Sequence, residues 1–141
     1  MWPNTPRLDK AQKYISYAIL IIAIVVLIFN YDKAYTALNC GYAIVLLSLQ
    51  LFVVKGAYMG KFYRFYFWHL IPFFIVNGIL TGTGIDQEVV WYNNTENLGI
   101  RMGTIPVEDS LYSLSLMLMN ITILEYLKSR FKKHNQIPIV A

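Results

Sequence analysis

The amino-acid sequence predicts an all-α integral membrane protein with about four transmembrane helices and both termini on the cytoplasmic side. Hydrophobic residues make up 57% of the 141 residues and charged residues only 14%, which leaves too little polar surface for a soluble domain of this length. The apolar residues form four runs, each near the roughly 17–25 residues that a membrane-spanning helix needs. The charged residues fall almost entirely between these runs.

We therefore expect a single membrane domain over residues 1–141, in a multi-pass protein of the cell membrane. Each predicted helix lies on one apolar run, and each connection lies on the polar residues between two runs. The expected parts are helices at about 14–30, 36–54, 65–85 and 107–127, an ordered non-cytoplasmic loop at 86–106 and a basic cytoplasmic tail at 128–141.

Basic residues set the predicted orientation, because short loops rich in lysine and arginine stay on the cytoplasmic side. They cluster before the first run, between the second and third, and after the fourth, at Arg7, Lys10, Lys13, Lys55, Lys61, Arg64, Lys128, Arg130, Lys132 and Lys133. Most acidic residues lie in the two other connections. Because the basic residues are split among three segments, we expect contact with membrane lipid headgroups and no binding of nucleic acid.

The second and third runs contain the groups that most often bind metals. Cys40 is the single cysteine of the chain and is expected to be a packed thiol. His69 and Asn77 lie inside the third run. A histidine inside a helix is more often a hydrogen-bonded packing residue than a ligand, and no second histidine, cysteine or carboxylate lies at metal-binding spacing. The sequence therefore predicts no metal site.

The long connection at 86–106 mixes acidic, amide, aromatic and glycine residues. Long loops are usually either functional or disordered, and the segment Val89-Val90-Trp91-Tyr92 is too hydrophobic for disorder. We therefore expect an ordered cap at the membrane surface. Arg101 in this cap is equally suited to pair with a nearby carboxylate or to contact lipid phosphates.

The fourth helix is expected to begin near Pro106, which suits the first helical turn, so that Glu108 and Asp109 enter at the membrane surface. The 100° step per residue places Glu108 and Tyr112 on one polar stripe. The opposite side includes Leu111, Leu114 and Leu118 and is expected to face lipid.

Two interpretations of the acid pair remain open. Acidic residues in a first turn complement the helix dipole and can simply face water at the headgroups. Two adjacent carboxyls in low-dielectric surroundings also repel each other, which favours one of them keeping its proton. A protonated carboxyl is what general-acid catalysis requires.

Aromatic residues are dense from Phe62 to Phe74 and recur at Trp91 and Tyr92. They suit an interfacial belt and a packed core. Aromatic faces can also line a channel for an unsaturated hydrocarbon and stabilise positive charge that develops on it. Motifs for nucleotide, hydride, acyl or phosphoryl chemistry are absent from the sequence, which lowers the support for these reaction classes.

One stretch of the sequence carries a family resemblance. Trp91-Tyr92-Asn93, Gly99-Ile100-Arg101-Met102-Gly103 and Pro106-Val107-Glu108-Asp109 resemble the membrane lycopene cyclase family. That family's signature is a Gly-x-Arg-x-Gly stretch that leads into Pro-x-Glu-Glu or Pro-x-Glu-Asp at a helix start. Residues 72–82 are similar to the family's preceding helix and residues 30–36 to an earlier connection, so the resemblance covers roughly residues 14–127.

The resemblance implies an isomerase of the intramolecular lyase type, which cyclises the linear ends of lycopene or a related carotenoid to β-rings without net redox change. An acid would protonate an end-group double bond, and the cation would close on a neighbouring alkene and lose a ring proton. The implied catalytic residues are Glu108, Asp109 and Arg101, with the arginine tuning the two acids. The implied substrate-binding residues are Tyr112, Trp91, Asn77, His69 and Pro106, of which Tyr112 and Trp91 would face the cation.

The chain departs from the family in one respect, because members usually carry two related modules and this sequence shows one signature, that of the second module. We expect a half-enzyme that pairs with a homologous first-module subunit, or a truncated form that begins at an internal Met1. No cofactor is predicted, although a flavin or nicotinamide bound in an unfamiliar way stays open. Two alternative functions also stay open: another end-group enzyme, such as a hydratase, and a non-catalytic carotenoid-binding membrane subunit.

Overall fold

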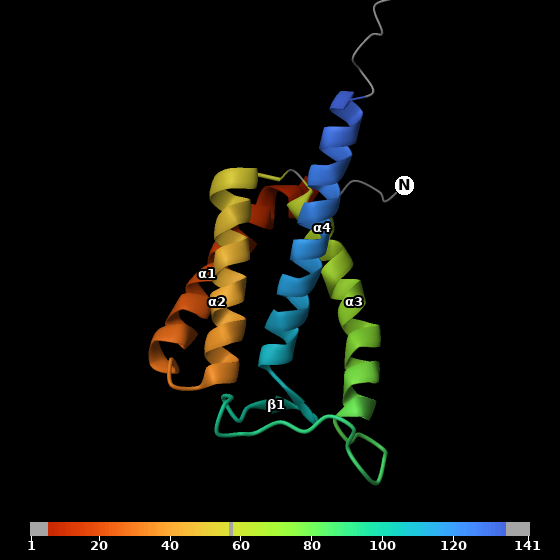
Figure 1. Ribbon diagram of the computed structural model, residues 1–141. Coiled ribbons are helices and arrows are strands. Elements are labelled where there is room, and N and C mark those ends of the chain that lie inside the picture. The colour runs from red at the N-terminus through yellow and green to blue at the C-terminus, as the bar shows by residue number, and fades with distance from the viewer. Residues whose placement is uncertain (1–5, 57, 135–141) are drawn as a thin grey trace, which may run out of the picture.

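The computed structural model describes residues 6–56 and 58–134, and four long helices dominate it (Figure 1). They are α1 (Pro6–Phe29), α2 (Ala34–Ser48), α3 (Met59–Leu80) and α4 (Glu108–His134), and a short π-helix, η1 (Leu49–Val54), continues α2. The predicted all-α fold with four helices is confirmed. The connection before α4 adds two short antiparallel strands, β1 (Arg101–Met102) and β2 (Ile105–Pro106).

Three helical segments are long and apolar enough to cross a membrane, namely Asp9–Phe29, Ala34–Val54 and Glu108–Phe131. Helix α3 has 22 residues but is not among the three. Lys61, Arg64 and His69 lie within it and lower its mean hydropathy. A fourth transmembrane pass through α3 and the cytoplasmic placement of both termini therefore stay predictions.

The helices do not begin and end where the apolar runs do. Helix α1 begins at Pro6 instead of near residue 14, and α4 continues to His134 instead of ending near residue 127. Lysine and arginine are good helix formers, so the helical hydrogen bonds continue through basic segments that hydropathy assigns to the connections. Helix α3 ends at Leu80, before Gly82 and Gly84, which have positive φ angles of 106° and 76°. The tail beyond residue 134 lies outside the described residues.

The four helices run alternately up and down (Figure 1). Helix α1 packs against α2 and α3, and α2 packs against α4. We call the end of the bundle that holds the turn 30–33 and the connection 81–107 the loop end. The opposite end, which holds the end of η1, the beginning of α3 and both described ends of the chain, is the terminal end (Figure 1).

All four helices contribute to one buried core, which includes Leu20, Leu47 and Phe62. Leu114 and Leu118 of α4 also belong to it and are 4% and 0% exposed. The prediction that these two residues face lipid is therefore wrong. The helical period correctly groups residues on one side of a helix, but it does not indicate which sides are covered by neighbouring helices.

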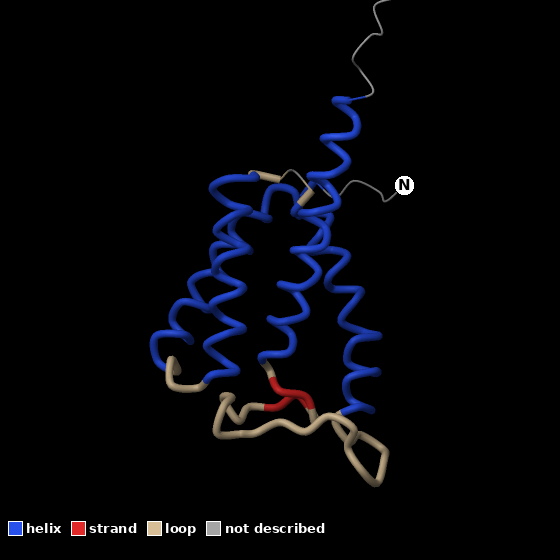
Figure 2. The backbone as a smooth tube through the Cα atoms, in the orientation of Figure 1, coloured by secondary structure: helices blue, strands red, loops and turns tan. Residues whose placement is uncertain are grey.

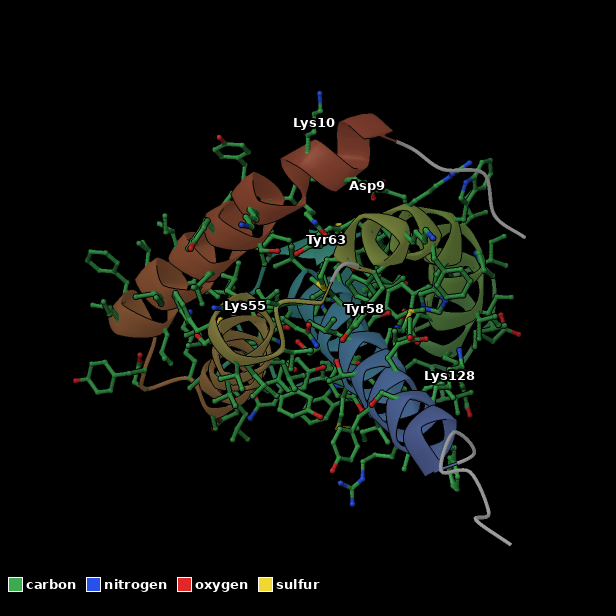
Figure 3. The ribbon with its side chains drawn as sticks, turned by 90° about the horizontal axis from the view of Figure 1, so that it is seen from above. Asp9, Lys10, Lys55, Tyr58, Tyr63 and Lys128 are labelled. Atoms are coloured by element: carbon green, nitrogen blue, oxygen red, sulfur yellow. The ribbon has the colours of Figure 1, made fainter. Side chains whose placement is uncertain are left out.

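The terminal end is held by neutral polar contacts between helices. Ser16 Oγ of α1 lies 2.6 Å from Tyr63 Oη of α3, and the Gln50 amide of η1 donates to Tyr58 Oη at 2.6 Å and to Thr122 Oγ1 of α4. Figure 3 looks down on this end, with Tyr58 and Tyr63 among the helices and Lys10, Lys55 and Lys128 projecting from three different segments.

Candidate active site

The connection 81–107 runs across the loop end and forms the floor of the bundle (Figure 2). Its first part is tied to the end of α3, because the backbone N–H groups of Val89 and Val90 both donate to Leu80 O at 2.9 Å. Its later part returns to α3 through Thr104 Oγ1, which lies 2.6 Å from Thr81 Oγ1. These contacts hold both parts of the connection against the end of α3 and fix the approach to α4.

Glu96 attaches the same connection to the beginning of α2. Its backbone oxygen accepts from the N–H groups of Tyr35 and Thr36 at 2.9 and 3.3 Å, and its carboxylate accepts from the N–H of Ala34 at 3.2 Å. The first N–H groups of a helix have no partner within the helix, and a negative charge there is favourable. A residue far away in the sequence thus caps α2 and brings Tyr35 and Thr36 to the start of α4.

Asp109 has both carboxylate oxygens fully engaged at this junction. Tyr35 Oη donates to Oδ1, while Tyr92 Oη and Asn77 Nδ2 donate to Oδ2 at 2.7 and 3.3 Å. The side chain is 2% exposed, and the rings of Tyr35 and Tyr92 meet edge to face with centroids 5.6 Å apart. Asp109 therefore joins α2, α3 and the connection to the first turn of α4.

Glu108 is bound differently, although it is the adjacent residue. Its Oε1 accepts from Thr36 Oγ1 at 2.7 Å and from the N–H of Leu98 at 2.6 Å. Its Oε2 is buried and has no hydrogen-bond partner, in a side chain that is 4% exposed. A buried oxygen without a hydrogen-bond partner costs free energy and often marks a functional group. In Glu108, Oε1 is held by two hydrogen bonds, while Oε2 is free to interact with a ligand.

Glu108 also lines an apolar cavity of about 280 Å³. Aliphatic side chains of α1 form one wall of it, and the polar side chains in the lining are those of Glu108 and Ser110, together with the Cys40 thiol and the Tyr66 ring. A cavity of about 150 Å³ is large enough for benzene, so this one has room for the end group of a longer hydrocarbon. The site can therefore place a carboxyl group against an apolar ligand.

Two larger hollows, of about 430 and 560 Å³, lie at the terminal end, and Glu125 lines both. The Glu125 carboxylate is 40% exposed and lies 3.0 Å from Lys128 Nζ. The Glu125 carboxylate is therefore open to solvent and engaged with a lysine, unlike the buried and unpartnered Glu108 Oε2. The smaller cavity beside Glu108 is the better candidate for acid chemistry.

Arg101 forms no ion pair with either acid in the described structure, and its role in tuning them stays a prediction. Its guanidinium donates to Thr104 O and to Asn94 Oδ1, both at 2.7 Å, and lies 6.0 Å from the centre of the Tyr92 ring. Gly103, with φ of 67°, forms the tight turn between β1 and β2 that brings Thr104 O back to the arginine. Arg101 thus braces the connection that carries Tyr92.

Three of the predicted substrate-binding residues lie near the acids but contact protein groups. Asn77 donates to Asp109, as described above, and His69 Nε2 lies 3.1 Å from Ser113 Oγ of α4. Pro106 is buried in β2 opposite Arg101, and α4 begins two residues later. The prediction that Pro106 lies in the first turn of the helix is therefore wrong. Of the three, Asn77 is the one that contacts an acid, and none of them lines the cavity beside Glu108.

Tyr112 and Trp91, the predicted neighbours of a cation, point elsewhere. Tyr112 is 46% exposed and Trp91 is 72% exposed, and neither lines the cavity. Tyr112 lies four residues after Glu108 on α4, so the helical period places both on one side, but of the two residues Glu108 is the one that Thr36 and Leu98 contact. Trp91 suits the membrane interface, where tryptophan is enriched.

Four residues that contact the two acids were not predicted from the sequence: Tyr35, Thr36, Tyr92 and Leu98. Tyr35 and Thr36 lie in a segment whose resemblance to the family was recognised, but no local pattern connects them with acids more than seventy residues away. Leu98 acts through its backbone N–H, which no side-chain pattern can reveal. The hydroxyl groups of Tyr35 and Thr36, at the start of the second apolar run, were the sequence feature that could have indicated a polar site at this end of the helix.

The Tyr92 hydroxyl is a stable hydrogen-bond donor. Burial, followed by the hydrogen bond to Asp109 and the charge of that carboxylate, raises the pKa of Tyr92 to about 12. The phenol therefore stays protonated at neutral pH and continues to donate to Asp109.

Among the described residues, no three histidine, cysteine, aspartate or glutamate side chains come together as a metal-binding group.

The comparison with protein families shows what the chain is similar to. A family model described as Lycopene cyclase matches residues 32–127, which is more than half of the chain. The match begins just before the Tyr35 and Thr36 contacts and ends beyond the acid pair. No curated protein and no solved structure shows a significant match to the chain.

Proposed function

The chain belongs to the lycopene cyclase family, and we propose that Glu108 is the acid that starts the cyclisation of a linear carotenoid end group. Membership of the family supports a role in carotenoid cyclisation, with a linear carotenoid as substrate. The observation that carries the proposal for Glu108 is its unpartnered Oε2 in a residue that lines an apolar cavity.

The hydrogen bonds of Glu108 favour one oxygen as the proton carrier. Oε1 already accepts two hydrogen bonds, which suits the carbonyl oxygen of a neutral carboxylic acid. Oε2 has no donor nearby, and an ionised oxygen without a donor would be costly in apolar surroundings. We therefore place the transferable proton on Oε2.

The proposed reaction conserves all atoms of the substrate. The Oε2 proton is transferred to the terminal double bond, and the resulting cation is attacked by the π electrons of a neighbouring double bond, which forms the ring carbon–carbon bond. The ring cation then loses a proton to the Glu108 carboxylate, which leaves a ring double bond and restores the acid. The product is an isomer of the substrate, so this intramolecular lyase reaction needs no electron-transferring cofactor.

Asp109 has a supporting role in this proposal. Its two oxygens already accept hydrogen bonds from Tyr35, Tyr92 and Asn77, so no lone oxygen remains to exchange a proton with a hydrocarbon. It fixes the first turn of α4 and thereby the direction of Glu108. Arg101 supports it indirectly, because the arginine braces the connection that carries Tyr92.

We also propose that the chain is a multi-pass protein of the cell membrane with cytoplasmic termini, and that it acts with a homologous first-module subunit. The three long apolar helices support membrane insertion, and the lysines at the terminal end support this orientation (Figure 3). A site built near the membrane surface by the loop end is well placed to receive a hydrocarbon from the bilayer.

The test is pigment analysis of lycopene-accumulating cells that express the chain alone or with a first-module partner. Glu108→Gln is a close structural match, since the glutamine oxygen can still accept from Thr36 and Leu98 and only the unpartnered Oε2 is replaced. Loss of a general acid should lower ring formation by about 100-fold or more. Glu125→Gln, on the same helix, is the matched control and should retain activity.

The outcomes separate the candidate functions. Ring formation by Glu108→Gln at the wild-type level would contradict the acid role and support a carotenoid-binding subunit. A hydroxylated product without rings would support a hydratase instead. One observation favours that second candidate: the Ser110 Oγ is also buried without a partner, and Ser110 lines the same cavity, where a water molecule could bridge it to the acid.

A further inference from the structure

Tyr66 is the one aromatic side chain among the described residues that line the Glu108 cavity. It lies on α3 and is 8% exposed. The other lining side chains, apart from Glu108, Ser110 and Cys40, are aliphatic. An end group in the cavity would therefore have one carboxyl and one aromatic ring as its main electron-rich neighbours.

The orientation of the Tyr66 ring is fixed from several sides. Its hydroxyl donates to Ser110 O of α4 at 2.6 Å. The ring lies nearly parallel to that of Phe62, with centroids 6.2 Å apart, and the His69 ring lies 6.5 Å away on the next turn. A ring held in this way needs no reorganisation when charge develops beside it.

We infer that the Tyr66 ring stabilises the carbocation formed in the cavity and directs it toward ring closure. The inference rests on the proposed function of Glu108. A cation beside an aromatic face is attracted by the electron density of the ring, and the attraction is largest where water is excluded. Aliphatic side chains of α1 cannot supply this stabilisation.

Attack by water competes with ring closure for the cation, and this competition makes the role of Tyr66 measurable. If water reaches the cation, its oxygen forms a bond to the cationic carbon and releases a proton, which gives a tertiary alcohol. If water is kept out, a neighbouring double bond closes the ring, and a ring proton is lost. The fraction of alcohol among the products therefore reports whether the cavity wall still protects and stabilises the cation.

The first experiment compares Tyr66→Phe with Tyr66→Leu in the pigment assay with the partner module. Tyr66→Phe keeps the ring and loses only the hydrogen bond to Ser110, so it should retain ring formation within about threefold. Tyr66→Leu loses the ring and should lower ring formation roughly 30-fold, which corresponds to about 2 kcal/mol, with a higher fraction of alcohol. Equal ring formation by both variants at the wild-type level would overturn the inference.

A second experiment separates electronic stabilisation from simple packing. Phenylalanines with one, two and three fluorine atoms, introduced at position 66, keep the shape of the ring but withdraw electron density from its face. Ring formation should fall stepwise with each fluorine, while the same series at Phe62, which contacts Tyr66 but does not line the cavity, should have no such trend. A flat series at position 66 would assign Tyr66 to packing alone.

Failure of this inference differs from failure of the proposed function. If wild type forms rings and Glu108→Gln does not, a flat fluorine series overturns only the role of Tyr66. If Glu108→Gln forms rings as wild type does, the acid role fails and the inference about Tyr66 fails with it.

Discussion

The two ends of the bundle both hold buried polar clusters, but they use different chemistry. The terminal end joins its helices through neutral hydroxyl and amide groups, at Ser16, Tyr63, Gln50, Tyr58 and Thr122. The loop end buries two adjacent carboxyls, one surrounded by donors and the other beside an apolar cavity. Each end also contains a buried carboxyl oxygen without a hydrogen-bond partner, Asp9 Oδ1 at the terminal end and Glu108 Oε2 at the loop end, and Gln50 Oε1 is unpartnered as well. Of these three residues, Glu108 is the one that lines the apolar cavity, where a free carboxyl oxygen can meet a hydrophobic ligand. The comparison separates contacts that join the helices from contacts that the proposed reaction would use.

The largest effect is expected from Asp109→Asn at the loop end. The amide has one acceptor oxygen where the carboxylate has two, so at least one of Tyr35, Tyr92 and Asn77 loses its acceptor. We expect the free energy of unfolding to fall by about 1–3 kcal/mol and ring formation to fall about 100-fold. Unfolding by denaturing detergent and pigment analysis measure the two effects.

The control for Asp109→Asn is Asp32→Asn, at an exposed position in the turn 30–33. It makes the same change of charge at the same end of the bundle and should leave both measurements unchanged. If the two variants behave alike, the cluster around Asp109 does not hold the site together, and the contrast between the two ends loses its basis.

Gln50→Leu tests the terminal end. The substitution removes the donor to Tyr58 and Thr122 in a side chain that is 3% exposed, so unfolding should become about 1–2 kcal/mol easier. Ring formation per folded molecule should stay at the wild-type level, because the cavity beside Glu108 lies at the other end. A folded Gln50→Leu variant without activity would show that the two ends are coupled.

The two ends also differ in how far the sequence predicts them. Apolar runs and basic residues are local features, so the four helices and the acid pair at 108–109 could be predicted directly. The partners of the acids could not, because Thr36 and Tyr35 reach Glu108 and Asp109 across more than seventy residues and the backbone of Leu98 carries no side-chain signal. Periodicity describes one helix at a time and contains no information about which helices become neighbours.

The aromatic residues illustrate the same limit. The sequence is rich in rings between Phe62 and Phe74, and nothing in their spacing distinguishes Tyr66 from its neighbours. The family resemblance implies Trp91 and Tyr112 as neighbours of the cation, yet both are exposed. The position of a ring relative to the cavity depends on how α3 packs against α4, which is a tertiary property.

Glu96→Ala is expected to have a smaller effect, at the contact between the connection and α2. The variant loses the hydrogen bond from the Ala34 N–H to the carboxylate, while the backbone oxygen still accepts from Tyr35 and Thr36. Loss of a helix-capping side chain typically costs about 1 kcal/mol. Thermal unfolding in detergent measures the change, and Glu88→Ala in the same connection is the control. A loss greater than that of Asp109→Asn would reverse the proposed order of importance at this end.

The smallest effect is expected from Tyr92→Phe, and it should depend on pH. Burial and the hydrogen bond to Asp109 raise the pKa of Tyr92 from 10.0 to about 12, so the folded state holds this proton more tightly than the unfolded state does. The proton on Tyr92 therefore contributes stability in full below pH 10, and the contribution is lost as the pH rises toward 12. Wild type should be about 0.5–1 kcal/mol more stable than Tyr92→Phe at pH 8, and unfolding curves measured at increasing pH should converge. The exposed Tyr31→Phe variant is the control. Parallel curves for wild type and Tyr92→Phe would mean that the phenol stabilises the loop end by packing and not through its proton.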